Sequence, residues 1–178
     1  AGGARISRVV DRGAGRGAVV VVEGGWGDAA GGAARATAQQ VLFCRADGGF
    51  ATAGQPGDAP LEALPPVPSR PPDQTLDMPT LPSAALLYRL NGDRNPIHVL
   101  PQAAREAGFE RPILHGLCTY GMAARAVLQA GHAGELTWIS SIAARFSAPV
   151  FPGETLHARL WFEREQVQFE LWAIERKV

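Results

Sequence analysis

An acid and an imidazole lie close together near the middle of the chain. Residues 91–98 read Asn-Gly-Asp-Arg-Asn-Pro-Ile-His, so Asp93 and His98 share a segment that Gly92 and Pro96 constrain. Histidine titrates near neutral pH and a carboxylate accepts protons, so the pair can polarise a water molecule between them. Glycine lets a ligand approach the backbone closely, and proline drives the preceding residue to an extended conformation. The pattern therefore favours general acid–base chemistry on a stiff turn.

A second turn, Leu114-His115-Gly116-Leu117, stands at the start of a long apolar segment that ends near Gly131. We expect a helix from Gly116 to about Ala130. The amide of Gly116 would then be a free donor with the helix dipole behind it, which stabilises a developing negative charge. An acid, a base and such a donor are the parts needed to add water across an activated double bond. The alternatives are that Asp93 merely caps a turn, that His98 is a half-buried surface residue and that Gly116 only starts a helix.

The remaining elements of the second half of the chain follow from periodicity and from Pro and Gly positions. Leu117, Tyr120, Gly121, Ala124, Val127 and Leu128 recur at helical spacing, and their small neighbours suit a helix lying closely against a concave sheet. Leu156, Ala158 and Leu160 alternate with His157 and Arg159, as in a strand with two different faces. The pattern predicts short helices at 83–90, with Ser83 as N-cap, and 101–107, strands at 137–146, 155–163 and 166–175, and a tight hairpin at 163–166.

The first half of the chain has a different composition. Val19–Glu23 and Ala38–Phe43 are β-like runs separated by the Gly-rich residues 24–32, and no long helix is expected to cover them. Residues 54–82 are rich in proline, which removes backbone donors, so they are expected to form an extended connector. The predicted organisation is a strand-only unit at 1–53, a linker at 54–82 and an α+β domain at 83–178.

Composition excludes several classes of protein. The formal net charge is +0 at pH 7, which gives no reason to expect a nucleic-acid or membrane-surface partner. Cys44 and Cys118 lack a CxxC spacing and are expected to be buried thiols of a reducing compartment. No apolar run is long enough to span a membrane. The chain starts at Ala1 without a signal peptide, so we expect an intracellular, trimmed product of a longer gene.

Three motifs in order resemble those of one known family. YRLNGDRNPIH at 88–98 and FERPILHGLCTYG at 109–121 are similar to the hydratase 2 motif, and RFSAPVFPGE at 145–154 looks like the same family's strand and turn beside its thioester site. The family is that of the MaoC-like, R-specific 2-enoyl-CoA hydratases. The resemblance is strong over 80–178 and looser over 5–72. It implies an α+β hot-dog fold, in which an antiparallel sheet wraps a long central helix, with an incomplete second hot-dog half at the N-terminus.

The resemblance also assigns residue roles. It implies that Asp93 and His98 activate one water for syn addition to trans-2-enoyl-CoA, giving (R)-3-hydroxyacyl-CoA. Gly116 would hold the thioester carbonyl, and Asn95 and Gly92 would order the site. Arg145, Phe146 and Pro149 of the third motif are the expected CoA-side contacts. For Arg145 this rests on the affinity of a guanidinium for phosphates, and pairing with solvent or a carboxylate is an equal alternative. The family usually has a small hydroxyl, Gly or Cys side chain where this chain has Asn91.

Further expectations accompany this assignment. No metal or redox cofactor is expected, since CoA enters as part of the substrate; His115 and Cys118 are too few ligands for a metal, and a helix-start hydrogen bond is the better interpretation of His115. A homodimer is expected because hot-dog sheets usually pair at their edges. The C-terminal Arg-Lys-Val is not a peroxisomal signal, and a bacterial cytoplasm is the expected location. Two rivals stay open: a hot-dog thioesterase and a non-catalytic acyl-CoA-binding hot-dog protein.

Overall fold

The computed structural model describes residues 2–27, 33–51, 56–131 and 139–176, and it divides the chain into two compact units, 1–63 and 64–178. This division differs from the boundaries predicted at 53 and 82. Within the predicted linker, Gln74–Pro79 forms strand β4 and pairs with strand β5 (Thr155–Phe162) of the second unit. Prolines of this segment lie mainly before β4, and Pro79 ends it, which leaves the intervening residues free to donate to a sheet.

The first unit is a three-stranded antiparallel sheet. Strands β1 (Gly2–Asp11), β2 (Ala18–Gly27) and β3 (Ala34–Cys44) follow each other in the order β1-β2-β3. The β-like character predicted for this region is confirmed, and no helix occurs in the parts of the unit that the structure describes. The Asp11 carboxylate accepts hydrogen bonds from the amides of Gly49 (2.7 Å) and Ala51 (2.6 Å), which fixes the chain that follows β3. That this unit belongs to a second hot-dog half stays a prediction.

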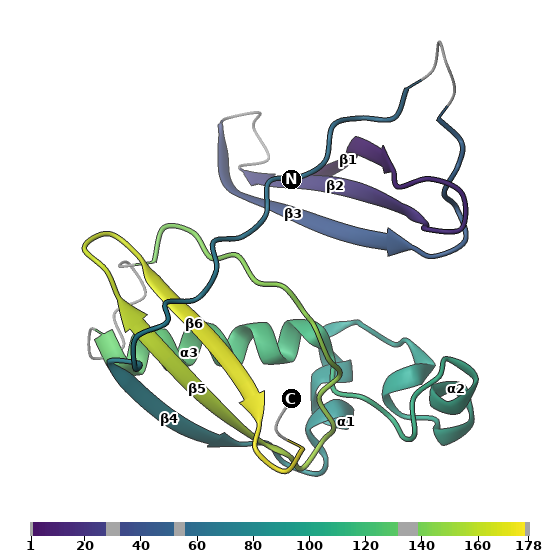
Figure 1. Cartoon of the computed structure of the whole chain (residues 1–178). Coiled ribbons are helices and arrows are strands. Elements are labelled where there is room, and N and C mark those ends of the chain that lie inside the picture. Colours follow the sequence, from purple (N-terminus) through teal and green to yellow (C-terminus); the bar gives the residue numbers. More distant parts are fainter. Residues whose placement is uncertain (1, 28–32, 52–55, 132–138, 177–178) are drawn as a thin grey trace. The chain divides into compact units, whose positions relative to one another are not determined.

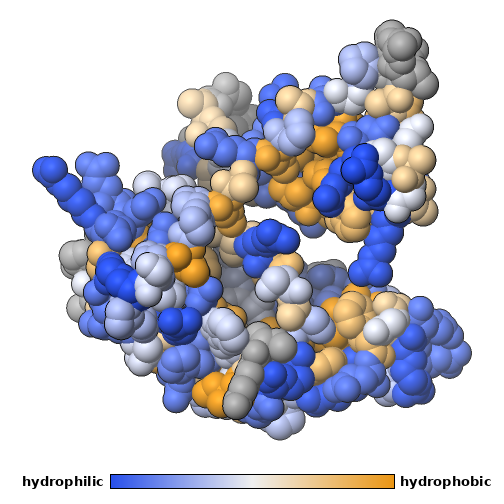
Figure 2. Space-filling view, in the orientation of Figure 1, coloured by the Kyte–Doolittle hydropathy of each residue, from blue (hydrophilic) through white to orange (hydrophobic). Residues whose placement is uncertain are grey.

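Apolar side chains gather on the visible face of this first unit (Figure 2). A contiguous patch of exposed apolar side chains usually marks a surface that another element covers. The exposed large apolar residues of the unit are Ile6, Trp26, Val41, Leu42, Phe43 and Phe50.

The second unit is built on the antiparallel sheet β4-β5-β6, in which β6 spans Val167–Ala173. The predicted alternation in β5 is confirmed: Leu156, Ala158 and Leu160 are each 0% exposed. The predicted tight hairpin is also present, since the Glu163 amide donates to the Gln166 carbonyl over 2.9 Å. The sheet therefore offers one apolar face on which a helix can pack.

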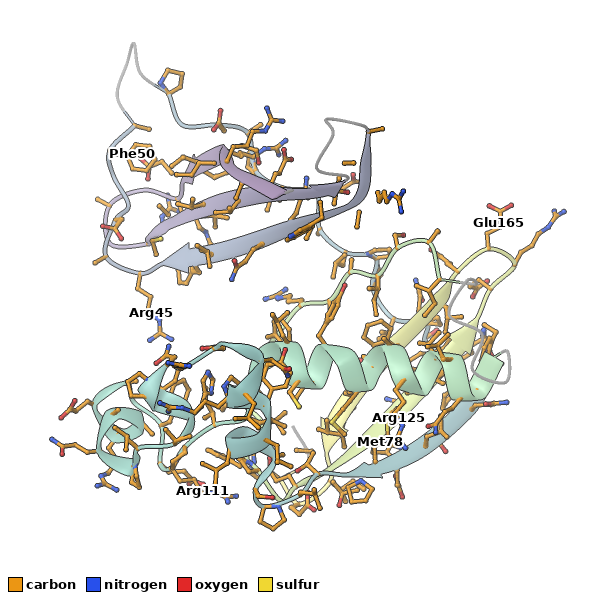
Figure 3. The ribbon with its side chains drawn as sticks, turned by 180° about the vertical axis from the view of Figure 1, so that it is seen from behind. Arg45, Phe50, Met78, Arg111, Arg125 and Glu165 are labelled. Atoms are coloured by element: carbon orange, nitrogen blue, oxygen red, sulfur yellow. The ribbon has the colours of Figure 1, made fainter. Side chains whose placement is uncertain are left out.

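That face is covered by helix α3 (Gly116–Gly131), which contacts all three strands (Figure 1). Met78 on β4 packs with Ala126 of α3, beneath the helix in Figure 3, and Ala126 is 0% exposed. The helix was predicted, and its buried face was predicted in part, since Val127 and Leu128 are buried as expected. The buried residues of the helix are Thr119, Ala123, Ala126, Val127 and Leu128, whereas Leu117 is 64% exposed. Close approach to the sheet selects the small residues rather than the largest ones.

The shorter helices also form where expected. Helix α1 spans Ala84–Tyr88, the 3-10 turns η1 and η2 span Arg89–Asn91 and Pro96–His98, and helix α2 spans Pro101–Glu106. Ser83 is the N-cap residue by position, but its side chain makes no capping hydrogen bond. Among the described residues, no helix is both long and apolar enough to cross a membrane.

The strand predicted at 137–146 is wrong for its described part, residues 139–146, which form no strand; 137 and 138 lie outside the described residues. A strand needs a neighbour to satisfy its backbone, and none pairs with this segment among the described residues. A side chain fixes it instead: the Tyr120 hydroxyl of α3 donates to the Ile142 carbonyl over 2.7 Å. The segment is thereby held along the helix and leads into the residues 145–154.

A cavity in the core of the second unit should lower the stability of the fold. Leu156→Ala should lower the free energy of unfolding by about 2–5 kcal/mol, because Leu156 is fully buried against Met78 and Ala126. Leu86→Ala, at a position that is 59% exposed, should change it by less than about 0.5 kcal/mol. Denaturant unfolding followed by tryptophan fluorescence measures both, and equal effects would contradict this core assignment.

Candidate active site

The turn that carries the predicted acid and base is locally rigid. Gly92 has φ +107°, a left-handed conformation that favours glycine. The Asp93 carboxylate accepts from the Asn95 amide over 3.1 Å, and the Asn95 side-chain oxygen accepts from the Ile97 amide over 3.2 Å. Asn95 thus caps η2, whose first residue is Pro96. The short polar residues and the proline together fix where His98 emerges.

Asp93 and His98 face each other. The Nε2 atom of His98 lies 3.9 Å from Oδ2 of Asp93, with side chains 8% and 51% exposed respectively. On the other side of the ring, Nδ1 lies 2.8 Å from the Ile113 carbonyl oxygen. A carbonyl only accepts, so Nδ1 carries a proton; in the neutral form of the ring, Nε2 therefore presents a lone pair toward the carboxylate. Both groups are acceptors, and the gap is too long for a direct hydrogen bond but suits a bridging water.

His115 lies directly against this pair. Its ring stacks on that of His98 with centroids 3.7 Å apart and planes at 23°, and it is 1% exposed. Its Nε2 lies 3.2 Å from the Asp93 carbonyl oxygen, so Nε2 donates. Burial lowers the pKa of His115, so this ring is neutral at neutral pH. The hydrogen bond expected from His115 at the helix start is therefore made by its backbone, whose carbonyl accepts from Cys118, and not by its ring.

These three side chains are a poor cradle for a metal ion, although their ligand-type atoms lie within 4.8 Å of one another. The rings of His98 and His115 are stacked, so their nitrogen lone pairs lie in nearly parallel planes, which disfavours a shared centre. The Nε2 atom of His115 is also occupied as a donor to the Asp93 backbone. Metal ligands must converge on one centre with free lone pairs, so the arrangement fits proton transfer better than coordination.

Gly116 follows His115 and opens helix α3. None of the hydrogen bonds among the described residues uses its amide, which is thus available at the positive end of the helix. A pocket of about 250 Å³ adjoins Gly116 and is mostly apolar. Its walls come from the segment before α3, from α3 itself and from the third motif: Phe109, Ile113, Leu114, Gly116, Thr119, Phe146, Ser147, Ala148, Pro149 and Val150.

The wall formed by the third motif is fixed by an ion pair between the buried Glu154 and the partly exposed Arg176. The Arg176 guanidinium donates to both Glu154 carboxylate oxygens and, over 2.6 Å, to the Pro149 carbonyl. The Phe151 ring packs against Arg176 and against Arg111, whose guanidinium carbon is 4.4 Å from the ring centroid; Figure 3 labels Arg111. Burial acts to raise the pKa of Glu154, but hydrogen bonds from Arg176 and the Phe151 amide hold it below its ordinary value.

This wall is joined directly to the start of α3. The Leu114 amide donates to the Val150 carbonyl over 2.7 Å. Leu114 is buried and lies two residues before Gly116. The position of the free amide therefore depends on the third motif as well as on the helix.

The structure assembles only some of the predicted residues. Asp93 and His98 adjoin each other, and Gly116, Phe146 and Pro149 line one pocket, whereas Arg145 is exposed and is not part of that lining. Their roles stay predictions. Sequence reasoning missed three residues of the site: His115, Glu154 and Arg176. Glu154 ends the third motif, which was the available signal, but nothing in the sequence linked it to Arg176.

Comparison with known proteins identifies relatives of this chain. The family described as "MaoC like domain" matches residues 64–178. The 3-hydroxyacyl-thioester dehydratase Y of Mycobacterium tuberculosis is 47% identical over 157 residues, covering 88% of this chain and 53% of that protein. The peroxisomal enoyl-CoA hydratase 2 of Arabidopsis thaliana is 42% identical over 142 residues, covering 76% and 45%. The chain thus spans about half the length of these curated relatives.

Solved structures agree with the architecture. A MaoC-like dehydratase from Phytophthora capsici superposes with a TM-score of 0.87 at 34% identity, covering 99% of this chain and 58% of that one. A Mycobacterium tuberculosis protein with a double hot-dog fold superposes with a TM-score of 0.54 at 16% identity, covering 96% and 62%, which bears on the fold alone. The predicted hot-dog fold is confirmed.

The buried ion pair predicts a pH-dependent stability. Glu154→Gln should lower the free energy of unfolding at pH 7 by about 2 kcal/mol, below the usual cost of breaking a buried pair because water reaches part of Arg176. Since the folded pKa of Glu154 is depressed, its contribution is full above the unfolded pKa of about 4.3 and is lost as pH falls through the folded value.

The difference between wild type and Glu154→Gln should therefore shrink below about pH 4. Glu170→Gln is a matched control, because Glu170 pairs with Arg159 over 3.0 Å in a more exposed position and should contribute no more than about 1 kcal/mol. Urea titrations between pH 7 and pH 3 measure both. A difference that grows on acidification would contradict the assigned charge state of Glu154.

Proposed function

Because this chain belongs to the family of the MaoC-like domain, which matches residues 64–178, we propose that it catalyses the reversible hydration of a trans-2-enoyl-CoA to (R)-3-hydroxyacyl-CoA. The observation that carries the proposal is the pair of facing acceptors, Nε2 of His98 and Oδ2 of Asp93, 3.9 Å apart. Two acceptors at this separation suit a water that donates one proton to each and keeps a lone pair for attack. The names of the Arabidopsis and mycobacterial relatives support the same reaction class.

In the proposed reaction the water oxygen bonds to C3 while one of its protons passes to the Asp93–His98 pair. The π electrons of the C2–C3 bond move toward the thioester carbonyl oxygen. When that carbonyl re-forms, C2 takes a proton from the same pair, so both additions occur on one face of the double bond. One water is consumed and no electrons are exchanged. The reaction therefore needs no redox cofactor, and CoA takes part only as a portion of the substrate.

The free amide of Gly116 suits the charge that develops on the thioester oxygen. Attack at C3 gives an enolate-like state, and a donor at the positive end of α3 stabilises it more than it stabilises the uncharged substrate. The apolar pocket beside Gly116, which Phe146 and Pro149 help to line, would hold an apolar portion of the thioester. Arg145 is exposed, with no ion pair among the described residues, and would meet a CoA phosphate. A homodimer in the cytoplasm is part of this proposal.

The acid–base pair can be tested on crotonyl-CoA. Asp93→Asn keeps the shape of the side chain but removes the proton acceptor, so the rate of hydration should fall by about 100- to 10,000-fold. Asp77→Asn is the matched control, because Asp77 pairs with His157 on the sheet, outside the site. Loss of the enoyl absorbance measures hydration, free-thiol release detects thioesterase activity, and chiral chromatography identifies the product.

Thiol release from wild type without hydration would replace this assignment by a thioesterase. Binding of crotonyl-CoA without either reaction would leave a non-catalytic binding protein. An (S) product would overturn the proposed face of addition while leaving hydration intact.

Gly116 allows a test of the amide alone. Proline is tolerated at the first position of a helix, so Gly116→Pro removes the N–H while α3 keeps its start. The loss in kcat should be about 100- to 1000-fold. Gly116→Ala retains the amide, and its Cβ would meet the Phe146 ring at 3.5 Å, an ordinary contact, so it should stay close to wild type. Equal rates for the two folded variants would exclude Gly116 as the carbonyl donor.

A further inference from the structure

We propose that His115 is a positioning residue, which holds the acid, the base and the carbonyl donor of the site in one arrangement through a single neutral ring. The inference rests on the proposed hydration, since it concerns how the groups of that reaction are aligned. His115 does not touch the reacting atoms in this scheme. It acts through Asp93, His98 and Gly116, each of which it contacts or adjoins.

Three connections converge on this residue. Its Nε2–H donates to the Asp93 carbonyl over 3.2 Å, which fixes the backbone that carries the acid. Its ring stacks on the His98 ring with centroids 3.7 Å apart, which restricts the plane in which the base can lie. Its own carbonyl joins it to Gly116, whose amide is the proposed donor. A rotation of the His115 ring would therefore disturb the acid, the base and the adjoining turn together.

Other neighbours also restrain the His115 ring. The Tyr88 ring of α1 lies with its centroid 4.8 Å from that of His115 at a tilt of 43°. The next turn of α3 fixes the backbone, because Cys118 and Thr119 both donate to the His115 carbonyl. With 1% of the residue exposed, the ring has little room to adopt another rotamer.

The charge of His115 is as important as its position. A proton on both nitrogens would place a positive charge 3.7 Å from His98, the ring that must accept a proton during the reaction. Burial, the largest influence on its pKa, keeps His115 neutral. A neutral donor can fix the Asp93 backbone without making His98 a weaker base, which a lysine or arginine at this position could not do.

One feature of His115 is not explained by stability. Its Nδ1 is buried, and no partner for it occurs among the described residues. A buried acceptor without a donor destabilises a folded protein, so an apolar ring would suit the surroundings better. Retention of a polar ring at a destabilising position indicates that the polar edge is used, and Nε2 is the edge that makes a contact.

The informative variant is therefore His115→Phe. It keeps the stacked ring but removes both the donor to Asp93 and the unpaired Nδ1. We expect kcat for crotonyl-CoA hydration to fall by about 10- to 100-fold, as for a small misalignment of reacting groups, with KM within about threefold. The thermal unfolding midpoint should stay unchanged or rise. A fall in kcat without a fall in stability is a result that a merely structural role would not give.

Two further variants complete the experiment. His115→Gln keeps an N–H donor that can reach the Asp93 carbonyl but loses the stacked ring, so its kcat should lie between those of wild type and His115→Phe. His157→Phe applies the same substitution on β5, away from the site, and should leave kcat unchanged. Unchanged kcat in folded His115→Phe, or a loss confined to KM, would overturn the inference.

Long-range proton–nitrogen spectra of the histidine rings test the premise without any activity measurement. Wild-type His115, assigned by its loss in His115→Phe, should appear as a neutral ring protonated on Nε2 at neutral pH. A cationic ring, or a proton on Nδ1, would refute the inference even in an active enzyme. If these spectra agree but wild type does not hydrate crotonyl-CoA, the proposed function fails and the arrangement of the rings stands.

Discussion

The site depends on how the backbone of Ile113 and Leu114 is held between two neighbours. On one side the Ile113 carbonyl accepts from Nδ1 of His98 over 2.8 Å; on the other the Leu114 amide donates to the Val150 carbonyl over 2.7 Å. The first bond fixes the tautomer of His98, so that its Nε2 lone pair faces Asp93. The second ties the start of α3 to the third motif. Each bond lies only a few residues before Gly116.

The same arrangement explains why a distant ion pair matters. Glu154 and Arg176 are not near the acid–base pair in sequence, yet Arg176 also donates to the Pro149 carbonyl, next to Val150. The Arg176 guanidinium thus holds the segment around Pro149 and Val150, and the Val150 carbonyl in turn accepts from the Leu114 amide. Because Glu154 is buried and Arg176 is only partly exposed, the connection is stiff only while both are ionised. Alignment of the free Gly116 amide therefore depends on groups that do not line the pocket beside it.

Sequence patterns predicted the parts of the molecule that local rules determine. The turn of residues 91–98, the limits of α3 and the alternation in β5 follow from Gly and Pro positions, helical spacing and period two. What failed required knowledge of neighbours. β4 was hidden in a Pro-rich segment because pairing with β5 is long-range. Residues 139–146 look like a strand but lack a partner among the described residues, and a tyrosine hydroxyl holds them instead.

The prediction of the site was also incomplete, because contacts between residues distant in sequence cannot be predicted from local patterns. Motif order singled out Asp93, His98 and Gly116 as candidates, whereas His115 looked like a helix-start residue because its partners come from a turn 17 or more positions earlier in the sequence. A stacked, buried and neutral ring is a three-dimensional property with no local signature. Its unpaired Nδ1 is nonetheless a physical clue, because a buried acceptor without a donor lowers the stability of the fold. A polar group kept where it destabilises the fold is best explained by the geometry that its other edge maintains, here the backbone of Asp93, the proposed proton acceptor.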